Sequence, residues 1–320
     1  MKPIWGLLAL ATLLATGAEV QAQPPAPLGA QGFYRFPTLR GETLVFAAEG
    51  DLWVVGVEGG VARRLTTHPA QESDPILSPD GKTLAFTARY EGPVEVYTMP
   101  VGGGVPTRRT YEAEPSTATA WTPSGDLVYT TQHFSTLPDA QLVSLNLQTS
   151  ERTRVPLSQA SEGSYDASGR TLYFVRPAFH NNVTKRYKGG QARKIWKYTE
   201  GQAEAQVLTR DYDGESHSPL WWKGRVYFVS DRDGTMNVWS MDETGADLKQ
   251  HTRHAGWDVK RPALDAGRLV YQAGADLWLY DIAKGAERMI SITLPSDFDQ
   301  LREKWVKKPI EALTSVHLHP

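Results

Sequence analysis

Apolar runs that end in an aromatic residue recur along the chain, each one shortly after a glycine. The first run, Thr43–Phe46, follows Gly41. Runs of the same kind follow five more glycines, which are Gly81, Gly125, Gly169, Gly224 and Gly267. Successive glycines are 40, 44, 44, 55 and 43 residues apart. A repeat of this length is typical of a four-stranded propeller blade and is too long for most helical repeats.

Each repeat contains three further segments in a fixed order. A second apolar segment such as Asp51–Val55 follows the first, and then come a Gly-rich or polar turn and a charged segment such as Ala62–Thr66. A short apolar segment such as Pro75–Leu77 precedes each glycine turn. Strands covered on both faces are continuously apolar, whereas a charged outermost strand resists pairing with other chains. The pattern predicts an all-β fold, a six-bladed β-propeller of four-stranded blades.

The fourth interval is the longest because it contains an additional segment at 177–193. The segment is basic, and long inserts in propellers project from one face, where function tends to be located. We therefore treat it as a candidate contact site for a peptide or a partner protein. Its candidate residues are Lys185, Arg186, Tyr187, Lys188 and Arg193. A solvated extension of the hairpin, with no binding role, explains the same segment equally well.

The first 22 residues have the layout of a secretory signal peptide. Lys2 provides a positive start, residues 4–14 form an apolar run, and Val20-Gln21-Ala22 offers a cleavage site. That run is too short for a permanent membrane anchor, and no later stretch is long and apolar enough to cross a bilayer. We expect a flexible leader at 23–32 and a periplasmic or secreted mature protein. The cysteine count is 0, so the core must hold without disulfides.

Composition and motifs argue against several classes of function. The net charge of -2 offers no phosphate-neutralising surface, so we expect no nucleic-acid partner. The sequence has no Gly-x-Ser-x-Gly elbow and no His-Glu-x-x-His motif, and its 8 histidines are scattered. The glycines at 102–104 are typical of a turn, because no Lys-Ser or Lys-Thr follows them as in a phosphate loop. We expect no catalytic residue, no metal site and no cofactor in this chain.

The residues argue against two further kinds of site, a calcium loop and a catalytic centre in the pore. Asp231-Arg232-Asp233-Gly234 superficially suggests a calcium loop, but the distal Glu of an EF-hand is missing and a hairpin turn explains the glycine better. A pore-centred hydrolase or lyase would need carboxylates, histidines or arginines gathered at the ends of the inner strands. The sequence shows no such pattern, so we expect no such cluster.

The last residues of the chain look like the beginning of another blade. Ser315–Pro320, laid beside Asp74–Pro79, matches an inner strand that leads into a glycine turn. We therefore expect the propeller at 33–298, followed at 299–320 by a linker and the start of a second, truncated propeller. A further module is expected beyond it.

Several segments carry a resemblance to known families. The unit Ser78–Phe86 resembles the propeller repeats of the periplasmic protein TolB and of prolyl-oligopeptidase relatives. Four more segments, taken in order, are similar to the N-terminal six-bladed propeller of bacterial tricorn-type proteases. They are Gly60–His68, Thr184–Ala192, Gly224–Gly234 and Gly274–Leu277. The resemblance runs from about Phe33 to the end of the chain.

The resemblance implies a larger protein with serine endopeptidase activity. Tricorn-type proteins continue into a seven-bladed propeller and a serine peptidase core interrupted by a PDZ domain, and they assemble as oligomers. Their catalytic serine and histidine lie in that core, so this chain is expected to be a non-catalytic module that guides peptides to or from it. Some members hold a peptide's C-terminal carboxylate with an arginine pair of the first propeller. Arg63-Arg64 and Arg108-Arg109 fall on outer strands, the wrong place for it.

One alternative of another class stays open. A free-standing TolB-like periplasmic propeller that binds a protein partner would show the same repeats. Either way the partners are peptides or proteins, with no membrane association once the signal peptide is removed.

Overall fold

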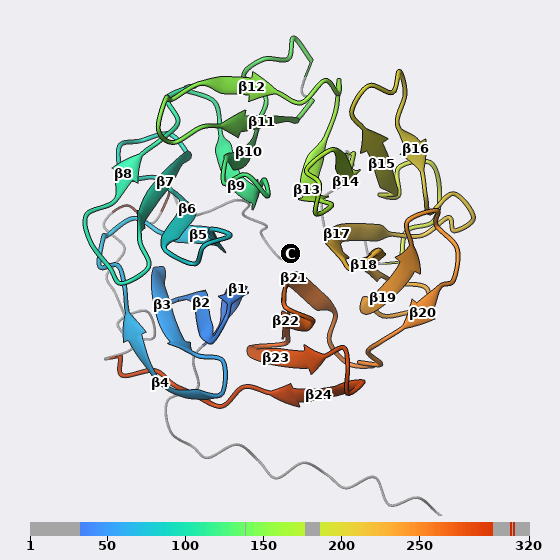
Figure 1. Cartoon of the computed structure of the whole chain (residues 1–320). Coiled ribbons are helices and arrows are strands. Elements are labelled where there is room, and N and C mark those ends of the chain that lie inside the picture. Colours follow the sequence, from blue (N-terminus) through green and yellow to red (C-terminus); the bar gives the residue numbers. More distant parts are fainter. Residues whose placement is uncertain (1–32, 138, 177–185, 297–307, 309, 311–320) are drawn as a thin grey trace, which may run out of the picture.

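Six blades, each with four antiparallel strands, surround a central axis in the computed structural model (Figure 1). The structure describes residues 33–137, 139–176, 186–296, 308 and 310. The innermost strands are β1 (Arg35–Arg40), β5 (Glu72–Leu77), β9 (Ser116–Trp121), β13 (Ser161–Tyr165), β17 (Ser216–Trp222) and β21 (Val259–Asp265). The second strands are β2 (Thr43–Ala48), β6 (Thr83–Ala88), β10 (Leu127–Thr131), β14 (Thr171–Val175), β18 (Arg225–Ser230) and β22 (Arg268–Ala273).

The outer half of each blade has two more strands. The third strands are β3 (Asp51–Gly56), β7 (Glu95–Pro100), β11 (Gln141–Leu145), β15 (Ile195–Thr199), β19 (Asn237–Asp242) and β23 (Asp276–Asp281). The outermost strands are β4 (Gly59–Arg64), β8 (Thr107–Arg108), β12 (Arg152–Arg154), β16 (Gln206–Val207), β20 (Lys249–Gln250) and β24 (Ala286–Met289). The predicted six-bladed, four-stranded propeller is therefore confirmed.

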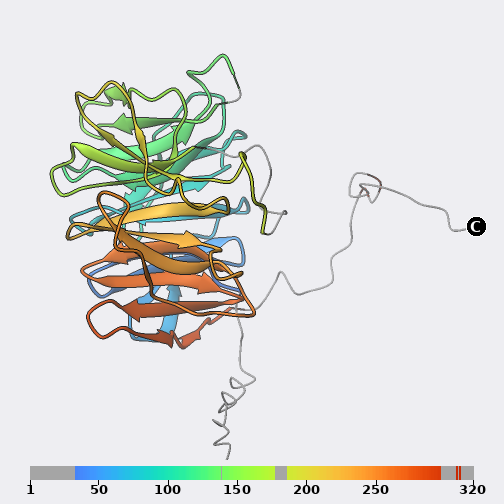
Figure 2. The same ribbon diagram turned by 90° about the vertical axis from the view of Figure 1, so that its right-hand side faces the viewer.

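The two faces of the disc, seen edge-on in Figure 2, carry different connections. The hairpin face carries the turns between first and second strands, such as the turn at Gly81, whose φ of 70° suits glycine. The insert face carries the connections between second and third strands, including the long one at 176–194, and the links between blades. Each inner strand therefore starts at the insert face and ends at the hairpin face.

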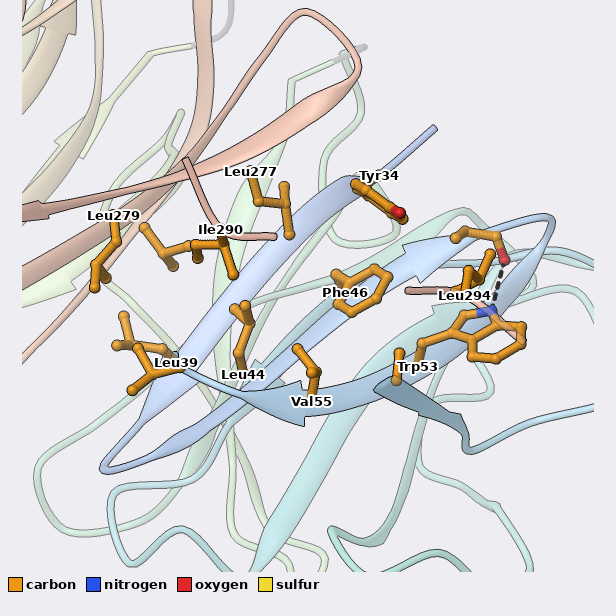
Figure 3. Packing of buried hydrophobic residues seen from close by; sticks show 14 residues of the cluster. Tyr34, Leu39, Leu44, Phe46, Trp53, Val55, Leu277, Leu279, Ile290 and Leu294 are labelled. Carbon is orange, nitrogen blue, oxygen red and sulfur yellow. Dashed lines mark hydrogen bonds between the residues drawn. The ribbon is translucent and has the colours of Figure 1, made fainter. Parts of the chain in front are cut away.

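Apolar layers between neighbouring blades form the core. Leu44 and Phe46 of β2, at 0% exposure, pack with Leu277 of β23 and with Leu294 between blades one and six (Figure 3). The indole of Trp53 in the same cluster donates a 3.0 Å hydrogen bond to the carbonyl of Ala48. Burial of one such large side chain contributes about 1.5–3 kcal/mol, and this is how a chain without cysteine holds together.

A threonine just after the outermost strand recurs in four blades. Its hydroxyl accepts a hydrogen bond from a backbone N–H at the start of the third strand. The pairs are Leu52 to Thr66 (2.8 Å), Val96 to Thr110 (2.9 Å), Ile195 to Thr209 (3.0 Å) and Val238 to Thr252 (2.9 Å). In these four blades the bonds tie the outermost strand to the third strand without a long backbone ladder.

Arginines of the outer strands also bond residues at the start of the third strands. Arg64 of β4 bonds the carboxylate of Asp51, and Arg108 of β8 bonds that of Glu95 at 2.8 Å. The prediction that Arg63-Arg64 and Arg108-Arg109 belong to outer strands is confirmed for the first three residues, and Arg109 follows β8 directly. Both acids are buried, so removal of either arginine would leave a buried carboxylate without its partner.

Closure of the ring depends on a short segment that follows the last strand of the sixth blade. β25 (Ile292–Thr293) pairs in parallel with β4 of the first blade. Gly60 donates a 2.9 Å hydrogen bond to the carbonyl of Ser291. At Gly59 a Cβ atom would lie 2.3 Å from that same oxygen, so the approach requires glycine.

Several predictions fall on parts of the chain outside the described residues. These are the signal peptide at 1–22, the leader at 23–32, most of the insert up to Lys185 and, apart from residues 308 and 310, the segment at 299–320. The boundaries proposed for the propeller, 33–298, stay a prediction. Among the described residues, none forms a helix long and apolar enough to cross a membrane.

Candidate functional site: a ring of bulge residues around the channel

The innermost strands share a break in register close to the insert face. In five blades the break holds a residue with φ between 46° and 54°. These residues are Phe36, Asp74, Glu162, Ser218 and Arg261, here called the bulge ring. In the third blade the register shifts at Thr119 without a positive φ.

Proline explains why the strands bulge there. Pro37, Pro75, Pro219 and Pro262 follow four of the ring residues, and Gly163 follows the fifth. Proline lacks the N–H of a ladder bond, so within sheets it occurs at edges and bulges. A left-handed conformation costs a residue with a side chain about 1–2 kcal/mol. Strain of this kind persists where the surroundings enforce it, and it clusters at functional sites.

Glu162 and Ser218 join the fourth and fifth blades at the channel. One carboxylate oxygen of Glu162 accepts hydrogen bonds from the backbone N–H of Ser218 (2.6 Å) and from its hydroxyl (2.9 Å). Arg193 lies 3.5 Å from the other carboxylate oxygen and donates a 2.7 Å bond to Glu215. The hydrogen bonds from Ser218 hold the carboxylate of Glu162 in place. The side chain is 31% exposed, so it remains in contact with water.

Two pKa shifts describe the electrostatics of this cluster. Burial opposes ionisation of Glu162, but the neighbouring His217, the charges of Arg193 and Arg261 and the hydrogen bond from Ser218 outweigh it and lower its pKa. For His217, burial and the charge of Arg193 lower the pKa to about 3. At neutral pH the cluster therefore presents an ionised Glu162 beside a neutral His217.

Ser218, His217 and Glu162 lie together but are not arranged as a catalytic triad. The Ser218 hydroxyl is 2.9 Å from His217 Nδ1 and donates to Glu162, which itself lies 3.9 Å from the same Nδ1. In a triad the histidine bridges serine and acid through its two ring nitrogens. Here both partners meet one nitrogen, and a pKa of about 3 makes the ring a weak base at neutral pH.

Arg261 spans three blades at the channel. From β21 it reaches Asp74 of β5, with a 3.0 Å separation between Nη1 and Oδ1. On the way its guanidinium lies 4.9 Å from the ring centroid of Phe36 in β1. Figure 1 shows β21, β1 and β5 side by side around the centre. Arg261 remains 53% exposed, whereas Asp74 is 14% exposed.

The candidate residues of the insert lie in different surroundings. Arg193 belongs to the channel cluster, as described above. Arg186 lies over blade five and donates a 2.8 Å hydrogen bond to the carbonyl of Gly234, while Lys188 is exposed and Tyr187 is half-buried. Lys185 lies outside the described residues.

The expectation that no charged cluster gathers at the inner-strand ends was wrong. Asp74, Glu162, His217 and Arg261 all lie in the first three residues of inner strands. A signal for Asp74 and Arg261 was the dipeptide of a polar or aromatic residue and proline, which recurs at this position in four of the six repeats. Among the described residues, no group of three or more His, Asp or Glu side chains could hold a metal ion.

A separate hollow of about 350 Å³ lies on the rim between the second and third blades. Glu112 lies in it, 3.4 Å from Arg152 and accepting a 2.7 Å hydrogen bond from the hydroxyl of Tyr129. Arg154 lies over the ring of Phe134 at 5.7 Å. The hollow is lined by outer-strand and loop residues and is distinct from the bulge ring.

Comparison with known proteins places the chain in a family. Residues 31–286 match the model of the tricorn protease N-terminal β-propeller domain. Tricorn protease homolog 1 of Streptomyces coelicolor is 33% identical over 276 residues, which cover 85% of this chain and 25% of that protein. The tricorn protease homolog of Saccharolobus solfataricus is 24% identical over 282 residues, 86% of this chain and 26% of that protein. The chain thus spans about a quarter of the length of these relatives.

Two solved structures show the same fold. The crystal structure of the tricorn protease superposes with a TM-score of 0.74 at 21% identity, covering 81% of this chain and 26% of that one. A putative TolB from Agrobacterium tumefaciens gives a TM-score of 0.58 at 18% identity, covering 81% of this chain and 89% of that one. At these identities the likeness concerns the fold alone.

Proposed function

This chain belongs to the tricorn protease N-terminal β-propeller family, and from that membership we propose that it guides peptides through its central channel to or from a serine peptidase core. The matched region is the propeller domain of tricorn-like proteases, and their catalytic domain is not in this chain. The peptidase core, the second propeller, the PDZ domain and oligomeric assembly are further parts of the proposal.

The bulge ring is the observation that carries the proposal. It places an aromatic ring, a hydroxyl, two carboxylates and a guanidinium on the innermost strands, at the face where peptides would enter or leave. Simple packing does not need these residues in a left-handed backbone that costs about 1–2 kcal/mol at each position. A strained, partly exposed polar ring is the expected form of a site that contacts a passing chain.

Two further features support a role in handling peptides outside the cytoplasm. The signal-peptide layout of residues 1–22 supports export to the periplasm or beyond. Arg193 connects the insert to the channel ring through Glu162, so a peptide or partner that binds the insert would also affect the ring. These points extend the proposal to localisation and to the insert as a contact region.

Thiol protection tests the proposal directly, because the sequence contains no cysteine and an introduced one is a unique label site. We would compare Arg261→Cys in the ring with Val105→Cys, which replaces an exposed residue in the turn between β7 and β8 on the hairpin face. A mixture of short unstructured peptides should slow alkylation at 261 and leave the rate at 105 unchanged. Equal rates with and without peptide at both positions would show that peptides do not occupy the channel.

A further inference from the structure

The guanidinium of Arg261 is only partly used by its protein contacts. Nη1 pairs with Asp74 at 3.0 Å. The ring of Phe36 in blade one lies against one side of the guanidinium, with its centroid 4.9 Å from Cζ. The side chain nevertheless keeps 53% of its surface exposed. Asp74 and Phe36 therefore fix where the guanidinium lies without covering it.

The guanidinium of Arg193, the other arginine of the site, is largely covered by its protein contacts. Its Nε donates to Glu215 and its Nη1 faces Glu162, and the side chain is 18% exposed. Glu215 is buried, so this arginine is held between two carboxylates. Arg261 is thus the arginine that has an accessible surface for a ligand.

A guanidinium fixed in this way favours stacking against flat aromatic rings, which an ammonium group does not do. It is planar and weakly hydrated, and it stacks on aromatic rings while its edge forms hydrogen bonds. Phe36 already shows that the site accepts this geometry on one side. A second ring could lie against the exposed part without displacing Asp74.

We propose that Arg261 is a specificity-determining residue of the channel, which binds aromatic side chains of peptides by stacking. The proposal rests on the proposed function, because the peptide must enter the channel to reach Arg261. Phe36 and Asp74 act as positioning residues, since they hold the guanidinium in place.

Capped peptides isolate the side-chain preference, since acetylated and amidated ends carry no terminal charge. Three peptides would share one sequence and differ at a central position, with Phe, Ala or Asp. Their dissociation constants would be measured by fluorescence anisotropy on the full chain. Cation–π contacts at exposed sites predict that the Phe peptide binds roughly two- to five-fold more tightly than the Ala peptide.

Two substitutions test whether Arg261 is responsible. Arg261→Lys keeps the charge and a partner for Asp74 but removes the planar group, so the preference for Phe over Ala should fall. The matched control is Arg170→Lys, at an exposed arginine on the hairpin face that lies 3.5 Å from Glu200. It should leave the preference unchanged. Melting temperatures of both variants would verify that the fold is intact.

The outcomes separate this inference from the function on which it rests. If the wild-type chain prefers the Asp peptide, and Arg261→Lys keeps that preference, recognition depends on charge and the stacking proposal is wrong. If the Phe preference is as large in Arg261→Lys as in wild type, stacking on the planar guanidinium of Arg261 is not its source. If peptides protect position 261 from alkylation yet Phe and Ala bind equally, peptide passage stands and only the aromatic selectivity is refuted.

Discussion

Protonation of Glu72 is expected to couple the stability of the propeller to pH. The side chain is 3% exposed and lies between the first two blades. Tyr90 donates a 2.6 Å hydrogen bond to one of its oxygens and Thr66 a 3.0 Å bond to the other. Burial raises its pKa from 4.5 to about 7, the nearby Asp51 adds to the effect, and the two hydrogen bonds only partly oppose it.

The direction of the effect follows from which state holds the proton. Between pH 4.5 and about 7, folded Glu72 keeps a proton that the unfolded chain has lost, so the free energy of unfolding falls as the pH rises. One pKa unit corresponds to about 1.4 kcal/mol, which makes the whole loss at most about 3.5 kcal/mol. Burial of His217 and His251, which lowers their pKa to about 3 and about 4, acts in the opposite direction below pH 6.5.

A glutamine at position 72 isolates this carboxyl, because the histidines titrate alike in both proteins. Urea unfolding of wild type and Glu72→Gln would be measured from about pH 5 to about pH 8. Gln imitates the protonated acid, so the variant should gain up to about 3 kcal/mol relative to wild type across that range. Glu42→Gln, at a position 75% exposed, should follow the wild type. Parallel profiles for Glu72→Gln and wild type would refute the assignment of a neutral acid at low pH.

Three more predictions address the scaffold. Thr110→Val removes a hydroxyl that bonds the buried Glu95 and should lower the free energy of unfolding by about 1–3 kcal/mol in urea titrations. Gly59→Ala places a Cβ against the carbonyl of Ser291, so the closing segment should become sensitive to limited proteolysis while wild type resists it. Phe46→Ala, at a fully buried position, should cost about 3–5 kcal/mol, and calorimetry would show the matching fall in melting temperature.

The blades could be predicted from sequence because their signal is local. Burial on both faces makes a second strand such as Thr43–Ala48 continuously apolar, and the adjacent glycine turn fixes where it begins. Both features recur within one repeat, so six copies reinforce one another. The parallel pairing of Ile292 with Gly60 joins segments 232 residues apart and depends on the ring closing, which no local pattern records.

The channel site escaped prediction for the same physical reason. Whether Glu162 meets Ser218 depends on how two bulged strands of different blades are aligned, and a one-residue change of register would point either side chain elsewhere. The pair of Arg261 and Asp74 crosses an entire intervening blade. The proline after four of the ring residues was visible in the sequence. It indicates a bulge, but it does not indicate which side chains of neighbouring blades meet there.

The ring also shows where a repetitive fold can become specific. At the positions that pack the blades together, the repeats keep the same chemistry, as Phe46 and Phe86 do in β2 and β6. At the bulge position the blades diverge, since Phe36 is aromatic, Asp74 is acidic and Arg261 is basic. Packing cannot be the cause of this divergence, because equivalent backbones would then favour equivalent residues. The repeat of the propeller places the bulge at corresponding positions in five blades around one channel, and the different side chains at these positions turn the channel into an asymmetric surface that can distinguish one peptide from another.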